Sequence, residues 1–143
     1  MKWTRQKRKG FTLVELLVVV GIIAMLASIM APRMFKGLGA TKAKIARTKM
    51  TIIENAIAQF QLNCGRIPSE ADGGLEALLV APADLTEKWV VPYCKKSDLL
   101  DPWDNPYQYV PNGVQNVGSF DLISYGADGQ EGGEGDNADI VNL

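Results

Sequence analysis

The stretch that decides the fold runs from Gly10 to Ala31 and reads GFTLVELLVVVGIIAMLASIMA. Between Phe11 and Ala31 there are 21 residues, and Glu15 is the only charged one. An α-helix rises about 1.5 Å per residue, so this run forms a helix roughly 30 Å long, which matches the hydrocarbon core of a bilayer. The run therefore predicts a transmembrane helix over 11–31, as the first half of a long N-terminal helix.

A short basic segment precedes the apolar run. Residues 1–10, MKWTRQKRKG, carry five Lys or Arg and no acid. A cleavable secretory signal would have an apolar core of about 7–15 residues and then a small-residue cleavage site, and this run is longer and lacks such a site before Pro32. A plain membrane anchor explains the length but not Glu15, because a carboxylate in a membrane helix is costly and usually marks function.

The order Lys9-Gly10-Phe11-Thr12-Leu13-Val14-Glu15 resembles the processing site of type IV pilin-like proteins. The resemblance implies that residues 1–10 are a leader, which a prepilin peptidase removes by cutting after Gly10, and that Phe11 becomes a methylated N-terminus. It also implies that Glu15 is the assembly glutamate. A carboxylate in apolar surroundings needs a cation, and the α-amino group of Phe11 on a neighbouring subunit would supply one.

Charge is distributed unevenly along the chain. The net charge is −1, but without the five cations of the leader only ten Lys and Arg remain against sixteen Asp and Glu. A mature chain of this sign is a poor partner for nucleic acid. The basic leader favours residues 1–10 in the cytoplasm and everything after Ala31 across the membrane. The resemblance implies a single-pass protein of the bacterial inner membrane with its C-terminal part in the periplasm. Cations between Arg33 and Lys44 weaken this charge argument, so the orientation rests partly on the resemblance.

Residues 32–64 are predicted to continue the helix in amphipathic form. Pro32 either ends the membrane helix or kinks it, and the sequence leaves both open. Cations between Arg33 and Lys49 would meet lipid head groups or acidic neighbouring subunits, or would be solvated. Gly65 is a plausible left-handed cap. The predicted apolar face recurs at three- and four-residue steps and consists of Ile45, Ile52, Ile53, Ala56, Ile57 and Phe60.

Residues 65–143 are predicted to form a small globular region. The region begins with a short helix over 74–80, which Ser69 and Asp72 cap. A loop over 86–96 follows and buries Trp89 and Tyr93. Two strands, around 107–110 and 120–125, then pair as an antiparallel hairpin across the turn-rich segment 111–118. The predicted fold class is α+β, with a long N-terminal helix packed on a small antiparallel sheet and a C-terminal ion-binding loop.

Two further strings, GRIPSEADGGLEAL at 65–78 and DPWDNPYQY at 101–109, resemble the major pseudopilins of type II secretion systems. Ile67 stands where an aromatic residue is usual, Asp104 stands where Gly is usual, and one residue near Asp72 is extra. The resemblance covers Lys9 to Ile140. It implies a homopolymeric pseudopilus, built with minor pseudopilins by an inner-membrane assembly platform and its ATPase. By the same resemblance, this filament is expected to drive export of folded proteins through an outer-membrane secretin.

The C-terminal stretch 125–140, YGADGQEGGEGDNADI, holds five carboxylates and five glycines. Its composition is that of a flexible solvated tail, but carboxylates that glycines allow to fold back on one point also suit Ca²⁺. The stretch resembles the C-terminal calcium loop of the major pseudopilins. The resemblance implies that Ca²⁺ is bound by the side chains of Asp128 and Asp139 and next by Asp136, with backbone carbonyls of Tyr125 and Gln130.

Cys64 and Cys94 are candidates for a disulfide, because disulfides persist outside the cytoplasmic membrane. The sequence does not decide between a disulfide and two free thiols. The chain has no His, no phosphate loop and no G-x-S-x-G motif, so no enzymatic activity is predicted. The alternative function is a surface type IV pilin for adhesion, motility or DNA uptake. Such a pilin more often carries its Cys pair near the C-terminus.

Overall fold

The computed structural model describes the backbone of residues 10–142 and the side chains of residues 10–29 and 39–142. The chain divides into two compact units, one that ends at Gly37 and one that begins at Leu38. Residues 1–9 of the predicted leader lie outside the described residues.

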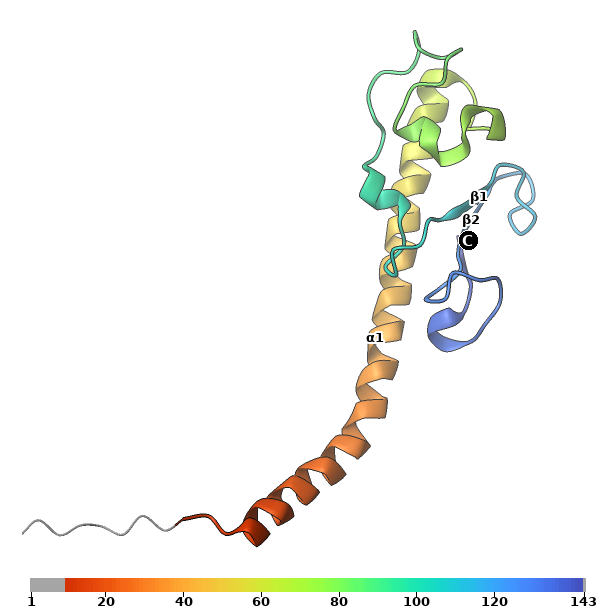
Figure 1. Cartoon of the computed structure of the whole chain (residues 1–143). Helices are drawn as coiled ribbons and strands as arrows, with labels where there is room; N and C mark the ends of the chain where they lie inside the picture. The colour runs from red at the N-terminus through yellow and green to blue at the C-terminus, as the bar shows by residue number, and fades with distance from the viewer. Residues whose placement is uncertain (1–9, 143) are drawn as a thin grey trace, which may run out of the picture. The chain divides into compact units, whose positions relative to one another are not determined.

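A single long helix, α1, runs from Leu13 to Cys64 (Figure 1). It continues through Pro32, so the alternative in which Pro32 ends the first helix is wrong. A proline removes only one helical hydrogen bond, and a long helix tolerates that loss. Helix α1 ends where the sequence predicts. Gly65 follows its last residue in the left-handed region, with φ 82°, and the Gly65 N–H donates to the Gln61 carbonyl at 2.8 Å.

The large apolar side chains described in the first unit are uncovered. Every large apolar side chain described between Phe11 and Ile29 is exposed, from 44% at Val19 to 81% at Phe11. Within the part of the chain that the structure describes, no helix is long and apolar enough to cross a membrane. The predicted membrane segment 11–31 also includes Met30 and Ala31, whose side chains lie outside the described residues.

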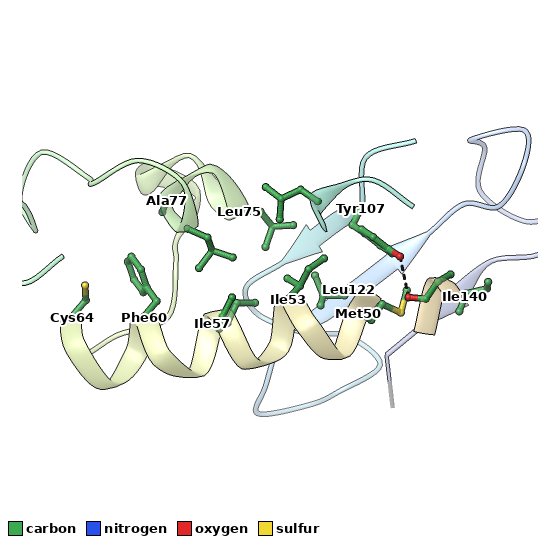
Figure 2. Close-up of a cluster of buried hydrophobic side chains, with 14 of the residues drawn as sticks. Met50, Ile53, Ile57, Phe60, Cys64, Leu75, Ala77, Tyr107, Leu122 and Ile140 are labelled. Atoms are coloured by element: carbon green, nitrogen blue, oxygen red, sulfur yellow. Dashed lines mark hydrogen bonds between the residues drawn. The ribbon is translucent and has the colours of Figure 1, made fainter. Parts of the chain in front are cut away.

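In the second unit α1 buries one face against the globular region. Figure 2 shows Met50, Ile53, Ile57 and Phe60 on one side of the helix, facing residues such as Leu122. The predicted positions Ile53, Ala56, Ile57 and Phe60 are at most 2% exposed, whereas Ile45 and Ile52 are 44% and 43% exposed. Each fully buried side chain of this size contributes about 1.5–3 kcal/mol, so this face is the main attachment of the helix.

A three-stranded antiparallel sheet packs on this face. Strand β1 is Gln108–Val110, β2 is Asp121–Ser124 and β3 is Ile140–Val141, in the order β1-β2-β3. Tyr109 pairs with Leu122 in the predicted hairpin, and Ser124 pairs with Ile140. The sequence did not predict β3, because two residues are too short to show an alternating pattern.

Short 3₁₀ turns replace the helix predicted over 74–80. The turn η2 (Gly74–Leu78) lies within that range, η1 (Glu70–Asp72) precedes it, and η3 (Lys96–Leu99) comes further along the chain. Ser69 and Asp72, predicted to cap the helix over 74–80, cap η1 instead. The Asp72 carboxylate accepts hydrogen bonds from the Ser69 N–H at 2.9 Å and from the Ser69 hydroxyl at 2.6 Å. Gly73 separates η1 from η2 with φ 84°, a backbone angle that interrupts a continuous helix.

The loop over 86–96 has no strand and packs two aromatic side chains on the core, as predicted. The Trp89 indole N–H donates to the Ala77 carbonyl at 2.8 Å. The Tyr93 ring lies edge-on to Phe60, with the ring centroids 5.6 Å apart. These contacts attach the loop to η2 and to the end of α1.

Candidate functional site

The residues predicted to serve in processing, Gly10 and Phe11, lie just before α1, and the predicted assembly residue Glu15 lies in its first turn. The Thr12 N–H donates to Oε2 of Glu15 at 3.4 Å, and the Glu15 N–H donates to Oγ1 of Thr12 at 3.2 Å. This reciprocal pair is a capping box, which satisfies two of the free N–H groups of a helix N-terminus. The Thr-x-x-Glu spacing at 12–15 is the sequence signature of this box. Glu15 therefore has a local partner in the single chain, beside the one predicted on a neighbouring subunit.

The predicted ion loop begins on a buried polar cluster. The Asp101 carboxylate is 1% exposed and accepts hydrogen bonds from the Asn105 N–H at 2.9 Å and from the Ser124 hydroxyl at 2.6 Å. The Asn105 side-chain amide in turn donates to the Gly126 carbonyl at 2.8 Å. These bonds fix the point at which the C-terminal loop, residues 125–139, leaves β2.

The structure places the five predicted ligand residues on this loop. Oδ1 of Asp128 accepts from the N–H of Gln130 at 3.2 Å, and Oδ2 of Asp139 accepts from the N–H of Gly132 at 2.9 Å. Tyr125 is half-buried beside β2. Asp136 lies in the turn η4 (Gly135–Asn137).

The carboxylates of the loop do not converge. Among the described residues, no three Asp, Glu or Cys side chains gather closely enough to hold a metal ion. The Asp136 carboxylate is instead directed at Gly39 of α1. The donor types still suit Ca²⁺, which prefers carboxylate and carbonyl oxygens, and the three predicted Asp ligands are exposed. The ion site remains a prediction.

Asp121, at the start of β2, is a buried carboxylate that the sequence did not single out. It is 1% exposed and accepts hydrogen bonds from the N–H groups of Val114 at 2.7 Å, Gln115 at 2.9 Å and Asn116 at 2.8 Å. Burial by itself would raise the pKa of Asp121, but these backbone N–H groups outweigh it and lower that pKa. The hydrogen bonds shape the loop between β1 and β2.

The two cysteines are free thiols in this structure, so the possible disulfide between Cys64 and Cys94 is not formed in it. Cys64 is buried and Cys94 is half-buried. Burial, with smaller contributions from nearby carboxylates, raises the pKa of Cys94 to about 11, so its thiol is protonated at neutral pH. The preceding residues, Asn63 and Tyr93, are hydrogen-bonded at 3.1 Å, so the two cysteines lie on segments in contact.

Comparison with known proteins gives a consistent result along the chain. Residues 33–143 match the family described as type II secretion system protein G, and residues 5–31 match the prokaryotic N-terminal methylation motif. The chain is 38% identical to the type II secretion system core protein G of Pseudomonas aeruginosa over 96% of both chains. It is 39% identical to the protein of the same name from Vibrio cholerae serotype O1, over 96% of this chain and 92% of that one.

A solved structure is also similar. The crystal structure of the major pseudopilin from the type 2 secretion system of enterohaemorrhagic Escherichia coli superposes with a TM-score of 0.57 and 25% sequence identity. The match covers 72% of this chain and 87% of that one.

Proposed function

This chain belongs to the type II secretion system protein G family, the major pseudopilins, and from this premise we propose how it works. The subunits polymerise at the inner membrane into a pseudopilus, which drives export of folded proteins through an outer-membrane secretin. The observation that carries this proposal is the joint match of one chain to the methylation motif over 5–31 and to protein G over 33–143.

The exposed apolar surface of the first unit supports a role in membrane and filament. Apolar side chains between Phe11 and Ile29 lie open to solvent in the single chain, and a surface of this kind is stable only when lipid or another apolar surface covers it. We propose that residues 11–31 span the inner membrane once before assembly and pack against other copies in the filament. The second unit then lies in the periplasm.

The residues at the start of α1 take the roles of processing and assembly. A prepilin peptidase cuts after Gly10, and the new N-terminus at Phe11 is methylated, as the motif over 5–31 suggests. Glu15 pairs with the α-amino group of a neighbouring subunit as each copy is added by the assembly platform and its ATPase. Minor pseudopilins are further partners.

We further propose that the C-terminal loop binds Ca²⁺ through Asp128 and Asp139. The loop carries five carboxylates, and their repulsion opposes the folding of the loop against β2. A bound cation would cancel that repulsion, and its binding free energy would add to the stability of the fold.

The test of the function is a host strain that lacks this gene, assayed for secreted hydrolases in the medium and for surface pili. Complementation with the wild-type gene and with an empty plasmid provides the controls. We expect loss of secretion with normal surface pili. Intact secretion with loss of pili, twitching or transformation would instead identify a surface type IV pilin.

A further inference from the structure

The buried face of α1 follows a regular series of three- and four-residue steps that begins, within the described side chains, at a glycine. Gly39 is buried, although it contributes no side chain to the core. Glycine is the poorest helix former after proline, so this position weakens the helix where the second unit begins. The full series is Gly39, Ala43, Ala46, Met50, Ile53, Ile57, Phe60 and Cys64.

The group that covers Gly39 is the carboxylate of Asp136. A methyl group added at Gly39 would overlap with Oδ1 of Asp136 and would lie 2.6 Å from its Cγ. A side chain at this helix position would therefore displace the Asp136 carboxylate from the helix. Only glycine allows the carboxylate to rest on the helix backbone.

The C-terminal loop holds η4 from its other side. The Ala127 N–H donates to the Asp136 carbonyl at 2.8 Å, and a Cβ at Gly126 would lie 2.6 Å from the same oxygen. A Cβ at Gly133 would lie 2.6 Å from the Asn137 carbonyl oxygen. The backbone of the exposed turn thus lies close to two glycines of its own loop, Gly126 and Gly133, and its Asp136 side chain lies close to Gly39.

Neighbouring contacts continue along the same stretch of the helix. The Lys42 ammonium lies 5.6 Å from the centroid of the Trp103 ring, and the Tyr107 hydroxyl donates to the Ala46 carbonyl at 2.9 Å. Among these contacts of the globular region with α1, that of Asp136 lies nearest the N-terminal end of the helix, within the described residues.

We propose that η4 is a clasp, by which we mean that its Asp136 side chain packs on α1 at Gly39. This contact holds the C-terminal loop against α1 and keeps the helix ordered from Gly39 onward. Gly39 serves two purposes, because it admits Asp136 and because its low helix propensity makes the helix depend on that contact. Withdrawal of Asp136 then releases both the loop and the first turns of the helix in the second unit. The clasp links the two segments whether or not an ion binds the loop.

The test uses the full-length protein in detergent micelles, as wild type, Gly39→Ala, Asp136→Ala and the double variant. In an ordinary helix Gly39→Ala would raise the melting temperature, because alanine is the better helix former. The clasp predicts the opposite sign, with a lower melting temperature for Gly39→Ala and recovery in the double variant, where the obstructing carboxylate is gone. Gly21→Ala is the matched control, because no atom lies within 4 Å of a Cβ at that helical glycine.

Hydrogen exchange provides the second measurement and remains informative if Gly39→Ala fails to fold. In Asp136→Ala, amides over both 38–46 and 126–139 should exchange faster, by roughly tenfold for a lost packing contact. A rise in melting temperature for Gly39→Ala, or faster exchange in the loop with an unchanged helix, would overturn the clasp. Both measurements are repeated with Ca²⁺ and with a chelator, which separates the clasp from the ion proposal. The clasp predicts the same ranking of the variants by melting temperature in both conditions.

Discussion

At the scale of single residues, Asp121 shows how a buried carboxylate organises a loop without any metal or cation. Its three backbone hydrogen bonds come from consecutive residues, Val114, Gln115 and Asn116. Three N–H groups directed at one carboxylate compensate for its removal from water. The sequence shows a turn-rich segment here, but it does not reveal which acid accepts these bonds, because that depends on how β1 and β2 pair.

Replacement Asp121→Asn should destabilise the fold by roughly 1–3 kcal/mol at neutral pH, because an amide accepts fewer of these bonds and adds an unpaired donor. The lowered pKa of Asp121 makes the effect pH-dependent. The stability that the carboxylate supplies is present above its ordinary pKa of 3.8 and is lost as the pH falls through the lower pKa of the folded state. Urea unfolding at neutral and strongly acidic pH measures both.

The control for this prediction is Asp104→Asn. Asp104 is exposed and has a φ of 67°, a left-handed angle that asparagine also adopts readily. Its substitution should change stability by no more than about 0.5 kcal/mol. An Asp121→Asn loss that stays constant down to strongly acidic pH would show that the carboxylate charge is not its source.

At the scale of elements, α1 shows how far periodicity carries a prediction. The amphipathic pattern identified Ile53, Ala56, Ile57 and Phe60 as buried, and they are. It also assigned Ile52 to the same face, but successive helical residues differ by about 100°, and only one of two adjacent isoleucines can point straight into the core. Which one does is decided by the sheet, which the helix pattern does not describe.

The adjacent isoleucines give a matched pair of substitutions. Ile53→Ala should cost roughly 2–5 kcal/mol, because Ile53 is 0% exposed and its removal leaves a cavity. Ile52→Ala should cost much less, because Ile52 is 43% exposed. Chemical denaturation of both variants compares them directly. Equal losses would show that the helix lies in a different rotation about its axis.

For the C-terminal loop, the sequence and the structure give different kinds of information. The motif resemblance assigned ligands, whereas the structure shows how the loop is tied down through Asn105 and Gly126. This hydrogen bond is not visible in a linear pattern, because it joins segments far apart in the chain. The resemblance also grouped Asp136 with the ligands, while the structure directs its carboxylate to Gly39.

The ion proposal predicts that Ca²⁺ raises the melting temperature of the wild type and that a chelator lowers it. An ion at a hundred times its dissociation constant stabilises a fold by about 2.7 kcal/mol. Asp128→Asn and Asp139→Asn should abolish this difference, whereas Glu87→Gln, an exposed carboxylate outside the loop, should retain it. A wild type that melts at the same temperature with Ca²⁺ and with chelator would refute the ion site.

At the scale of the whole molecule, the two units differ in how far their apolar side chains are buried. The second unit buries a core of its own, whereas the first unit exposes its large apolar side chains between Phe11 and Ile29. This asymmetry was readable in the sequence as an apolar run followed by an amphipathic pattern. Assembly was not readable in the same way, because the partner surfaces belong to other copies, and the role of Glu15 there rests on the family to which the chain belongs.

Glu15 is the residue at which capping and assembly are separable by experiment. Glutamine serves in a capping box as glutamate does, so Glu15→Gln keeps the hydrogen bonds with Thr12 and removes only the charge. If the carboxylate pairs with a neighbour's α-amino group, Glu15→Gln should still be processed and inserted but should not form filaments or support secretion. Thr12→Val is the complementary variant, because it weakens the cap, by about 0.5–2 kcal/mol, and leaves the charge in place.

The two roles predict opposite rankings of these variants. A charge pair between subunits makes Glu15→Gln the defective variant and leaves Thr12→Val able to assemble. A purely structural cap makes Thr12→Val the defective one and leaves Glu15→Gln close to wild type, because the helix N-terminus still has its partner. Quantification of sheared filaments and of secreted protein from strains that express each variant at equal level decides between them. Filaments at the wild-type level from Glu15→Gln would remove the charge pair from the assembly mechanism.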